Sequence, residues 1–334
     1  MTTSVLVIGG AGYIGSHAVK ALRSGGSDVI VYDDFSAGHR TASRFATAVV
    51  EGSIHDTTRL RDAMRQYDVD SVMHFAAWAS VGDSVRDPIG YYRNNVTGTL
   101  VVLEAMAAEH VALFVFSSSA AVFGNPVETP ITEDHPKTPI NPYGETKVAV
   151  ERALPHYERA YGIRSSVLRY FNAAGADPDG DLGEDHTPEL HLIPRAIDAA
   201  AGRGTFQIFG DDYPTPDGTC LRDYIHVTDL AEAHLLALDA LRSGAASSHY
   251  NLGNGKPTSV REVVEAVGRV AGRPVPVTIA PRREGDPAVL FSSSDRIKAE
   301  LAWRPRFEDL DAIVSTAWRW REQHPAGYST RVQH

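Results

Sequence analysis

A cluster of glycines near the N-terminus constrains the fold of this chain more than any other feature. An apolar run over residues 5–8 leads into Gly9, Gly12 and Gly15, and a helix-length segment follows over 16–22. Glycine lets the backbone turn sharply and lets a pyrophosphate approach it closely. The start of the following helix offers N–H groups and a positive dipole end to phosphates. Because the glycines stand between a strand and a helix, they predict a dinucleotide-binding turn rather than an ordinary loop.

An acidic residue, Asp33, follows the second predicted strand, 28–32. In such a unit, an acidic side chain at this position bonds the ribose hydroxyls of adenosine. A carboxylate would repel a 2′-phosphate, so the sequence favours NAD over NADP as the cofactor. The alternative is that Asp33 and Asp34 only begin a polar loop.

Short apolar strands alternate with helical segments through the first half of the chain. Further strands are predicted over 48–51, 71–77, 111–116 and 164–168, and long helices over 88–110 and 143–161. Such alternation is typical of an α/β fold with a Rossmann-type, doubly wound parallel sheet. Ligands bind that fold at the C-terminal ends of the strands.

The second half of the chain is less regular. It contains a predicted helix over 190–201 and a predicted strand over 221–227. We expect a smaller, mixed α/β C-terminal domain that covers the substrate end of the nucleotide cleft. The expected boundaries are 1–172 for the NAD-binding domain, with a return of the chain to it around 222–251, and 173–334 for most of the substrate domain.

Composition excludes several classes of partner. The formal net charge is −10 and no long basic run occurs, which argues against nucleic acid and anionic membranes. Cys220 is the only cysteine, so no intramolecular disulfide can form. The sequence shows no signal-peptide pattern and no apolar run of membrane-spanning length. We therefore predict a cytoplasmic protein with no metal site.

Tyr143 and Lys147 are four residues apart in a predicted helix and so share one face of it. To act as a base near neutrality, a tyrosine must have its pKa lowered by about 3 from its usual value of about 10. One ammonium about 4 Å away supplies that effect at an effective dielectric constant of 20. Ser119, at the end of the fifth strand, could bridge the substrate oxygen and Tyr143. The alternatives are an ordinary surface pair and a serine that bonds nearby backbone.

The chain resembles the extended short-chain dehydrogenase/reductase family, and within it the sugar-nucleotide epimerases. The resemblance covers nearly the whole chain and rests on residues 9–17, 91–96, 117–119, 168–172, 208–215, 217–227 and 282–286. It implies an NAD-dependent isomerase that reversibly inverts C4 of UDP-glucose and UDP-galactose through a 4-keto intermediate, with NAD tightly bound. Tyr143 would take the proton of the sugar 4-hydroxyl, while a hydride passes from C4 to NAD and returns to the opposite face.

The resemblance also implies the remaining site residues. Ser119, Tyr143 and Lys147 would be catalytic. The implied cofactor contacts are Gly9, Gly12, Tyr13, Ile14, Gly15, Asp33, Ser53, Ile54, Phe75, Ala76, Asn94, Ser117, Tyr143, Lys147 and Tyr170. The implied substrate contacts are Ser119, Tyr143, Asn172, His191, Leu192, Phe209, Arg222, Arg283, Asp286 and Leu290. Guanidinium groups suit phosphate oxygens, although surface salt bridges to Asp223 and Glu284 are the alternative for the two arginines.

A homodimer is also implied, through the helices that start near Pro88 and Tyr143. The apolar residues on more than one face of the first helix are Leu100, Val101, Leu103 and Met106. One face of such a helix must cover the sheet, and the other could pack against a second subunit.

Four positions depart from the usual family pattern: Ile8, Ser53, Ala79 and Leu290. Ser53 and Ala79 affect single cofactor contacts only. Leu290 replaces a large tyrosine beside the sugar, which predicts a wider pocket and turnover of the UDP-N-acetylhexosamine pair. The alternatives are a UDP-pentose or UDP-uronate 4-epimerase and a non-catalytic sugar-nucleotide sensor. A 4,6-dehydratase is disfavoured, because alanines follow Ser119 where an acidic residue would be needed.

Overall fold

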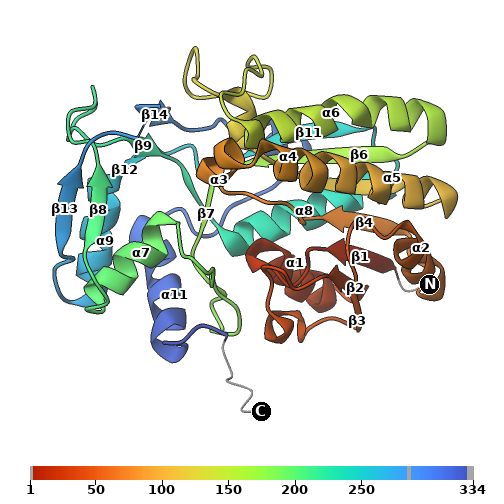
Figure 1. Ribbon diagram of the computed structural model, residues 1–334, viewed down its shortest axis with the longest axis horizontal. Helices are drawn as coiled ribbons and strands as arrows, with labels where there is room; N and C mark the ends of the chain where they lie inside the picture. The colour runs from red at the N-terminus through yellow and green to blue at the C-terminus, as the bar shows by residue number, and fades with distance from the viewer. Residues whose placement is uncertain (1–2, 284–286, 329–334) are drawn as a thin grey trace.

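A parallel sheet with helices on both faces dominates the computed structural model, which describes residues 3–283 and 287–328 (Figure 1). The strands that the described residues contribute to this sheet are, in spatial order, β11 (Ser248–Leu252), β6 (Arg164–Tyr170), β5 (Leu113–Ser119), β4 (Ser71–His74), β1 (Ser4–Ile8), β2 (Asp28–Asp33) and β3 (Ala48–Glu51). All neighbouring pairs are parallel. The chain runs outward from β1 to β3 and then reverses to β4, which confirms the predicted doubly wound, Rossmann-type fold.

Successive residues of the strands face opposite sides of the sheet, and both sides are covered. The covering helices are α1 (Tyr13–Ser24) and α8 (Val227–Arg242) on one face, and α2 (Thr57–Gln66), α5 (Gly98–Ala108) and α6 (Pro142–Tyr161) on the other. In β1, Val5 and Val7 belong to the first core, whereas Leu6 and Ile8 belong to the second, and all four are fully buried. Alternate residues of this one strand thus contribute to the apolar cores on both faces of the sheet.

A third apolar core, separate from the two that flank the sheet, lies in the C-terminal half, among the green and blue elements on the left of Figure 1. Its helices and paired strands are α7 (Leu192–Ala200), α9 (Val260–Ala271), α11 (Leu310–Gln323), β8 (Phe206–Phe209) and β13 (Val277–Ala280). Short strands connect this unit to the main sheet: β7 (Asn172–Ala174), β9 (Leu221–Arg222), β10 (Tyr224–His226), β12 (Thr258–Ser259) and β14 (Val289–Leu290). The remaining elements are α3 (Val81–Arg86), α4 (Pro88–Tyr91), α10 (Asp295–Glu300), η1 (Arg40–Ser43), the π-helix η2 (Tyr92–Thr97) and η3 (Ala120–Phe123).

Some predicted elements differ in extent. The strand predicted over 221–227 is two strands: β9 pairs with β12 and β14, while β10 pairs with β7. Between them Asp223 is buried, and its carboxylate accepts hydrogen bonds from the backbone N–H groups of Asn254, Gly255 and Ser292. The helix predicted over 88–110 is α4, η2 and α5 in succession. No helix among the described residues combines the length and the hydropathy that crossing a bilayer requires.

Candidate active site

The glycine turn between β1 and α1 is closely packed on the protein side. Gly9 has a φ of +79°, and a Cβ atom there would lie 2.5 Å from the backbone nitrogen of Ala76. A Cβ atom on Gly15 would lie 2.2 Å from the carbonyl oxygen of Gly9. At Gly12, by contrast, the nearest atom to a built Cβ is 3.5 Å away. The backbone at Gly9 and Gly15 is therefore too closely packed for any side chain. Gly12 faces open space, and a pyrophosphate bound at the start of α1 would need that space.

Asp33, the last residue of β2, has its carboxylate directed at this turn. It accepts hydrogen bonds from the backbone N–H of Ala11, at 2.9 Å, and of Phe35, at 2.8 Å. Burial raises the pKa of Asp33, and these two hydrogen bonds oppose that rise. Each carboxylate oxygen can accept more than one hydrogen bond. Asp33 thus fixes the shape of the turn and retains acceptor capacity for a ribose hydroxyl.

A cavity of about 510 Å³ runs from the glycine turn to the C-terminal unit. It brings together predicted residues from both halves of the chain. Those in its wall are Gly9, Gly12, Tyr13, Ile14, Gly15, Phe75, Ser119, Tyr143, Tyr170, Asn172, His191, Leu192, Phe209, Arg222 and Arg283. Its volume is in the range of cofactor and ligand sites in general. The cavity also lies at the C-terminal ends of β1, β4, β5 and β6, where a doubly wound sheet binds its ligands.

Helix α6 is held so that its first turn presents Tyr143 to this cavity. Pro142 occupies the start of the helix, and the side chain of Asn141 accepts a hydrogen bond from the backbone N–H of Gly144 at 2.9 Å. A Cβ atom on Gly144 would lie 2.4 Å from the carbonyl oxygen of Ala121. Only glycine therefore allows α6 to pack this closely on the segment after Ser119.

Lys147 lies one helical turn below Tyr143, as the spacing predicted. Its ammonium group donates a hydrogen bond to the carbonyl oxygen of Ser117 at 2.8 Å and lies 5.9 Å from the centre of the Tyr143 ring. The side chain is buried behind the cavity wall. The Lys147 ammonium is thus fixed in place between β5 and the tyrosine.

Burial dominates the pKa values of this pair. It raises the pKa of Tyr143, and a hydrogen bond from Ser119 only partly offsets the rise. It also lowers the pKa of Lys147 to about 7, although the carboxylate of Glu151 opposes the change. In the chain alone, the pKa of Tyr143 is therefore raised and not lowered as the spacing of Tyr143 and Lys147 led us to expect, because desolvation of the phenol dominates.

The substrate side of the cavity carries two arginines. The guanidinium of Arg283 lies 3.8 Å from the ring centre of Phe209. Arg222 donates hydrogen bonds to the carbonyl oxygens of Leu221 and Pro287, at 2.8 and 2.9 Å. The side chain of Asn172 donates to the carbonyl oxygen of Asp223 at 3.0 Å. These contacts orient the cationic groups in the wall of the cavity, where phosphate oxygens would suit them.

Other predicted residues are not part of the cavity wall that the described residues form. Ala76 donates its N–H to the carbonyl oxygen of Ile8, the hydroxyl of Ser117 contacts that of Tyr170, and Asn94 donates to Asn95. The hydroxyl of Ser53 accepts a hydrogen bond from the His55 N–H, and Ile54 packs in the core. Leu290 packs against the same apolar cluster as Phe171, a residue of the wall. Asp286 lies outside the described residues.

Two groups of polar side chains near the site were missed. One is a buried network behind Tyr143, in which Glu151 of α6 pairs with Arg169 of β6. The other is Glu184 and His186, which line the cavity beside His191. The local sequence around Glu151 does not indicate that its side chain is buried, because a glutamate on a helix is usually exposed. The periodic spacing of acidic residues and histidines over 184–191 was the available signal for the second group.

The histidines of the second group are ion-paired. Glu184 raises the pKa of His191 to about 10, against the opposing effect of burial. Burial alone would lower the pKa of His186, but Glu184 and Glu189 outweigh it and raise it to about 9. The substrate side of the cavity therefore ends in a compact set of paired charges.

Comparison with known proteins places this site in a family. Residues 5–253 match the NAD dependent epimerase/dehydratase family. A UDP-glucose 4-epimerase of Halalkalibacterium halodurans is 51% identical over 328 residues, which are 98% of each chain. The crystal structure of UDP-glucose 4-epimerase from Brucella ovis in complex with NAD is 50% identical, with a TM-score of 0.93 over 95% of this chain and 98% of that chain. That of Bifidobacterium longum in complex with NAD+ and UDP is 37% identical, with a TM-score of 0.91 over 97% and 100% of the two chains.

Proposed function

The chain belongs to the NAD dependent epimerase/dehydratase family, and we infer that it interconverts UDP-glucose and UDP-galactose by inverting C4, with NAD as its cofactor. The observation that carries this inference is the placement of Tyr143 and Ser119 in one cavity, between the glycine turn and the arginine pair. A dinucleotide and a UDP-sugar would meet at these two hydroxyls. Two UDP-glucose 4-epimerases that are 51% and 50% identical to this chain over at least 95% of its length support this conclusion.

The residues of the chain fit NAD. The close packing at Gly9 and Gly15, with space at Gly12, suits a pyrophosphate, and Asp33 suits a ribose that carries free hydroxyls. The Lys147 ammonium, fixed by the carbonyl of Ser117, suits the nicotinamide end beside Tyr143. When bound, NAD supplies the hydride acceptor and a positive charge that favours the phenolate form of Tyr143.

Proton transfer at the sugar falls to the two hydroxyls in the wall. The phenolate oxygen of Tyr143 would take the proton from the sugar 4-hydroxyl. It would later return that proton to the oxygen on C4, when the 4-keto group is reduced. The hydroxyl of Ser119 would hydrogen bond to that oxygen and hold it against the tyrosine. Because Tyr143 is buried, its proton exchanges slowly with water while the sugar is bound, which keeps it available for the return step.

Incubation of the purified protein with UDP-galactose tests this function. We expect UDP-glucose to accumulate to equilibrium without added reductant. Binding of the sugar nucleotide without conversion would instead favour a non-catalytic sensor. A cytoplasmic location belongs to the same proposal and is supported by the presence of a single cysteine, which forms no intramolecular disulfide.

The protein should be purified with NAD already bound. The catalytic cycle regenerates the oxidised cofactor at each turnover, so no exchange with the solution is needed. Denaturing the purified protein and measuring nicotinamide nucleotide in the supernatant checks this, and a supernatant without it would contradict the prediction. The variant Gly9→Ala provides a comparison, because its Cβ would collide with the backbone of Ala76, and it should retain less cofactor.

We also propose that two chains form a dimer through the α3, α4 and α6 region. Of the four apolar residues expected on more than one face of the helix predicted over 88–110, Leu103 and Met106 are fully buried and so lie on the face that covers the sheet. Exposed apolar side chains lie instead just before η2 and at its start: Trp78, Val81, Val85, Ile89 and Tyr92. Helices α3 and α4 pack against α6. Exposed large apolar side chains gathered in one short segment suit an interface with a second chain.

Light scattering should give twice the mass of one chain at micromolar concentration. The variant Ile89→Asp should shift the distribution toward a single chain, because Ile89 is 73% exposed in this surface. The control is Val127→Asp, a residue that is 81% exposed in a separate loop. A monomeric wild-type protein, or equal masses for all three proteins, would contradict the proposed surface.

Substrate selectivity should depend on Leu290. In the family the matching position lies beside C2 of the sugar, and leucine is smaller than the usual tyrosine. We expect the wild-type protein to epimerise the UDP-N-acetylhexosamine pair as well. Apolar pocket changes of this size alter discrimination by about 10- to 200-fold. The variant Leu290→Tyr should therefore lower kcat/KM for the acetylated pair relative to the plain pair. An unchanged ratio would exclude Leu290 as the selecting residue.

A further inference from the structure

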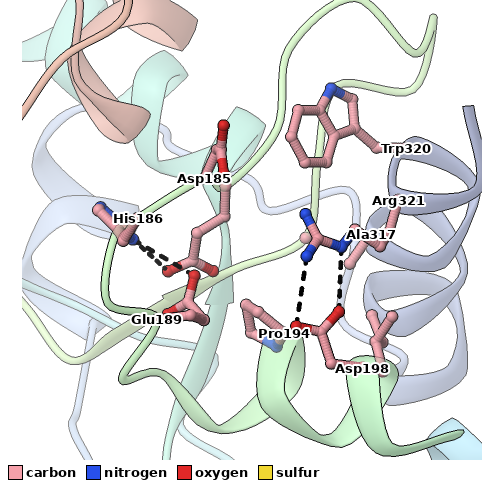
Figure 2. A pocket seen from close by; sticks show the side chains of 11 residues that line it. Asp185, His186, Glu189, Pro194, Asp198, Ala317, Trp320 and Arg321 are labelled. Atoms are coloured by element: carbon pink, nitrogen blue, oxygen red, sulfur yellow. Dashed lines mark hydrogen bonds and ion pairs between the residues drawn. The ribbon is translucent and has the colours of Figure 1, made fainter. Parts of the chain in front are cut away.

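A second, much smaller cavity of about 30 Å³ lies next to the large one. Figure 2 shows its lining, with the Asp198–Arg321 ion pair on one side and His186 joined to two carboxylates on the other. Its wall includes Glu184, His186 and Glu189. A space of this size holds about one water molecule or one ion.

Three side chains with metal-binding atoms line this cavity, and a fourth, His191, lies beside them in the wall of the large cavity. Glu184, His186, Glu189 and His191 follow the pattern Glu-x-His-x-x-Glu-x-His in the segment before α7. One donor atom from each lies within 4.8 Å of all the others. Two imidazole nitrogens and two carboxylate oxygens form a donor set that suits zinc and similar transition metals and disfavours magnesium and calcium.

The distances between donors approach those of a tetrahedral metal site. Bond lengths of 2.0–2.2 Å at a tetrahedral ion imply donor separations of about 3.3–3.6 Å. The Nδ1 atom of His186 lies 3.4 Å from Oε1 of Glu184 and 3.6 Å from Oε2 of Glu189, and that of His191 lies 3.3 Å from the other oxygen of Glu189, Oε1. The contact between His191 and Glu184, at 2.6 Å, is the exception and must lengthen by about 0.7 Å.

Burial shows that the carboxylate of Glu184 needs a cation beside it. Glu184 is only 9% exposed, and its Oε1 atom lies 2.6 Å from the Nδ1 atom of His191 and 3.4 Å from that of His186. Two protonated imidazoles can serve as that cation, and so can one metal ion that replaces their protons. A cation in the small cavity would contact the Oε1 atom of Glu184 and the Nδ1 atom of His186.

The other acidic cluster of the described residues differs in its donor atoms and in the cation that neutralises it. Asp177, Asp179 and Asp181 also bring their oxygens together, but the ammonium of Lys20 lies 2.6–2.9 Å from each of them. Arg44 pairs with Asp181 in addition. This cluster has no imidazole donor, and a lysine ammonium, which gives up its proton less readily than an imidazolium, already neutralises it, so it serves as the control.

We propose that Glu184, His186, Glu189 and His191 bind one divalent transition-metal ion of the zinc type. The ion fastens the segment before α7 at the edge of the large cavity, next to the residues that line its substrate side. Four protein ligands leave no open position, which makes the site structural rather than catalytic. Binding replaces the protons on the two Nδ1 atoms and releases them to solvent. The sequence alone had predicted no metal site.

Cobalt(II) binding to the tag-free protein tests this proposal, because tetrahedral cobalt gives intense visible absorption bands. We expect one equivalent per chain, with displacement of cobalt by zinc. His186→Ala and Glu189→Gln should abolish the bands, whereas Asp179→Asn should retain them. Far-UV circular dichroism of each variant establishes that it is folded. Glu189→Gln is the more conservative change, so it still tests the site if His186→Ala does not fold.

The proposal is overturned if the folded wild-type protein binds no stoichiometric cobalt, or if the bands persist in both His186→Ala and Glu189→Gln. It is also overturned if Asp179→Asn removes the bands, since that would place the ion in the other cluster. These outcomes are independent of epimerase activity, so failure of the metal site and failure of the proposed function are distinguishable.

Discussion

Replacement of Tyr143 by phenylalanine should lower kcat by about 10²- to 10⁴-fold, the usual contribution of a general acid–base group. The substitution removes only the phenol oxygen, and the ring keeps its place in the wall of the cavity at the start of α6. We therefore expect the thermal unfolding midpoint and the amount of bound NAD to remain close to those of the wild-type protein. Steady-state rates of UDP-galactose conversion provide the measurement.

A matched control exists on the same helix. Tyr161 is the last residue of α6 and is 62% exposed, so Tyr161→Phe makes the same chemical change away from the cavity. Its rate should equal that of the wild-type protein. If the Tyr143→Phe protein is folded, retains NAD and turns over at a rate near that of the control, Tyr143 is not the base.

The largest loss of stability should follow from Glu151→Gln. The Glu151 carboxylate accepts two hydrogen bonds from the guanidinium of Arg169, at 3.0 and 2.9 Å, and others from Ser118 and Lys137. Arg169 is only 2% exposed, so loss of the opposing charge leaves a cation buried without its partner. Breaking such a pair costs about 3–5 kcal/mol. Urea unfolding of variant and wild type should show this difference.

The control for that prediction is Glu158→Gln, a half-exposed glutamate on the same helix. We expect a change below about 1 kcal/mol, as for surface substitutions in general. Equal losses for the two variants would show that the Glu151–Arg169 pair does not hold α6 to β5 and β6. Since α6 carries both Tyr143 and Lys147, this pair also fixes the geometry of the candidate site.

Local sequence patterns predicted the main sheet well, because its determinants are short-range. The alternation of apolar residues in β1 and the glycines after it specify the strand, the turn and the helix without reference to the rest of the chain. The division of 221–227 was not predictable in this way. It depends on Asp223, which is buried by contacts with segments at 254–255 and 292 that are distant in sequence.

The candidate site shows the same limit. The pair Tyr143 and Lys147 was predicted from helical spacing, and the structure places them one turn apart. The pKa of Tyr143 was not predicted correctly for the chain alone, because its direction depends on how strongly the folded chain desolvates the phenol. The sequence likewise did not show which face of α5 covers the sheet. The amphipathic pattern of α5 is weak, so its buried face is set by packing against α2 and the sheet.

The central claim is that C4 of the sugar is inverted by removal and return of its own hydrogen within one closed site. UDP-galactose with deuterium at C4 tests it most directly, with the UDP-glucose product analysed by mass spectrometry and NMR. Our interpretation predicts conversion in ordinary water with the deuterium retained at C4 of the product. Absence of UDP-glucose, or product in which the deuterium has exchanged with solvent, would contradict it.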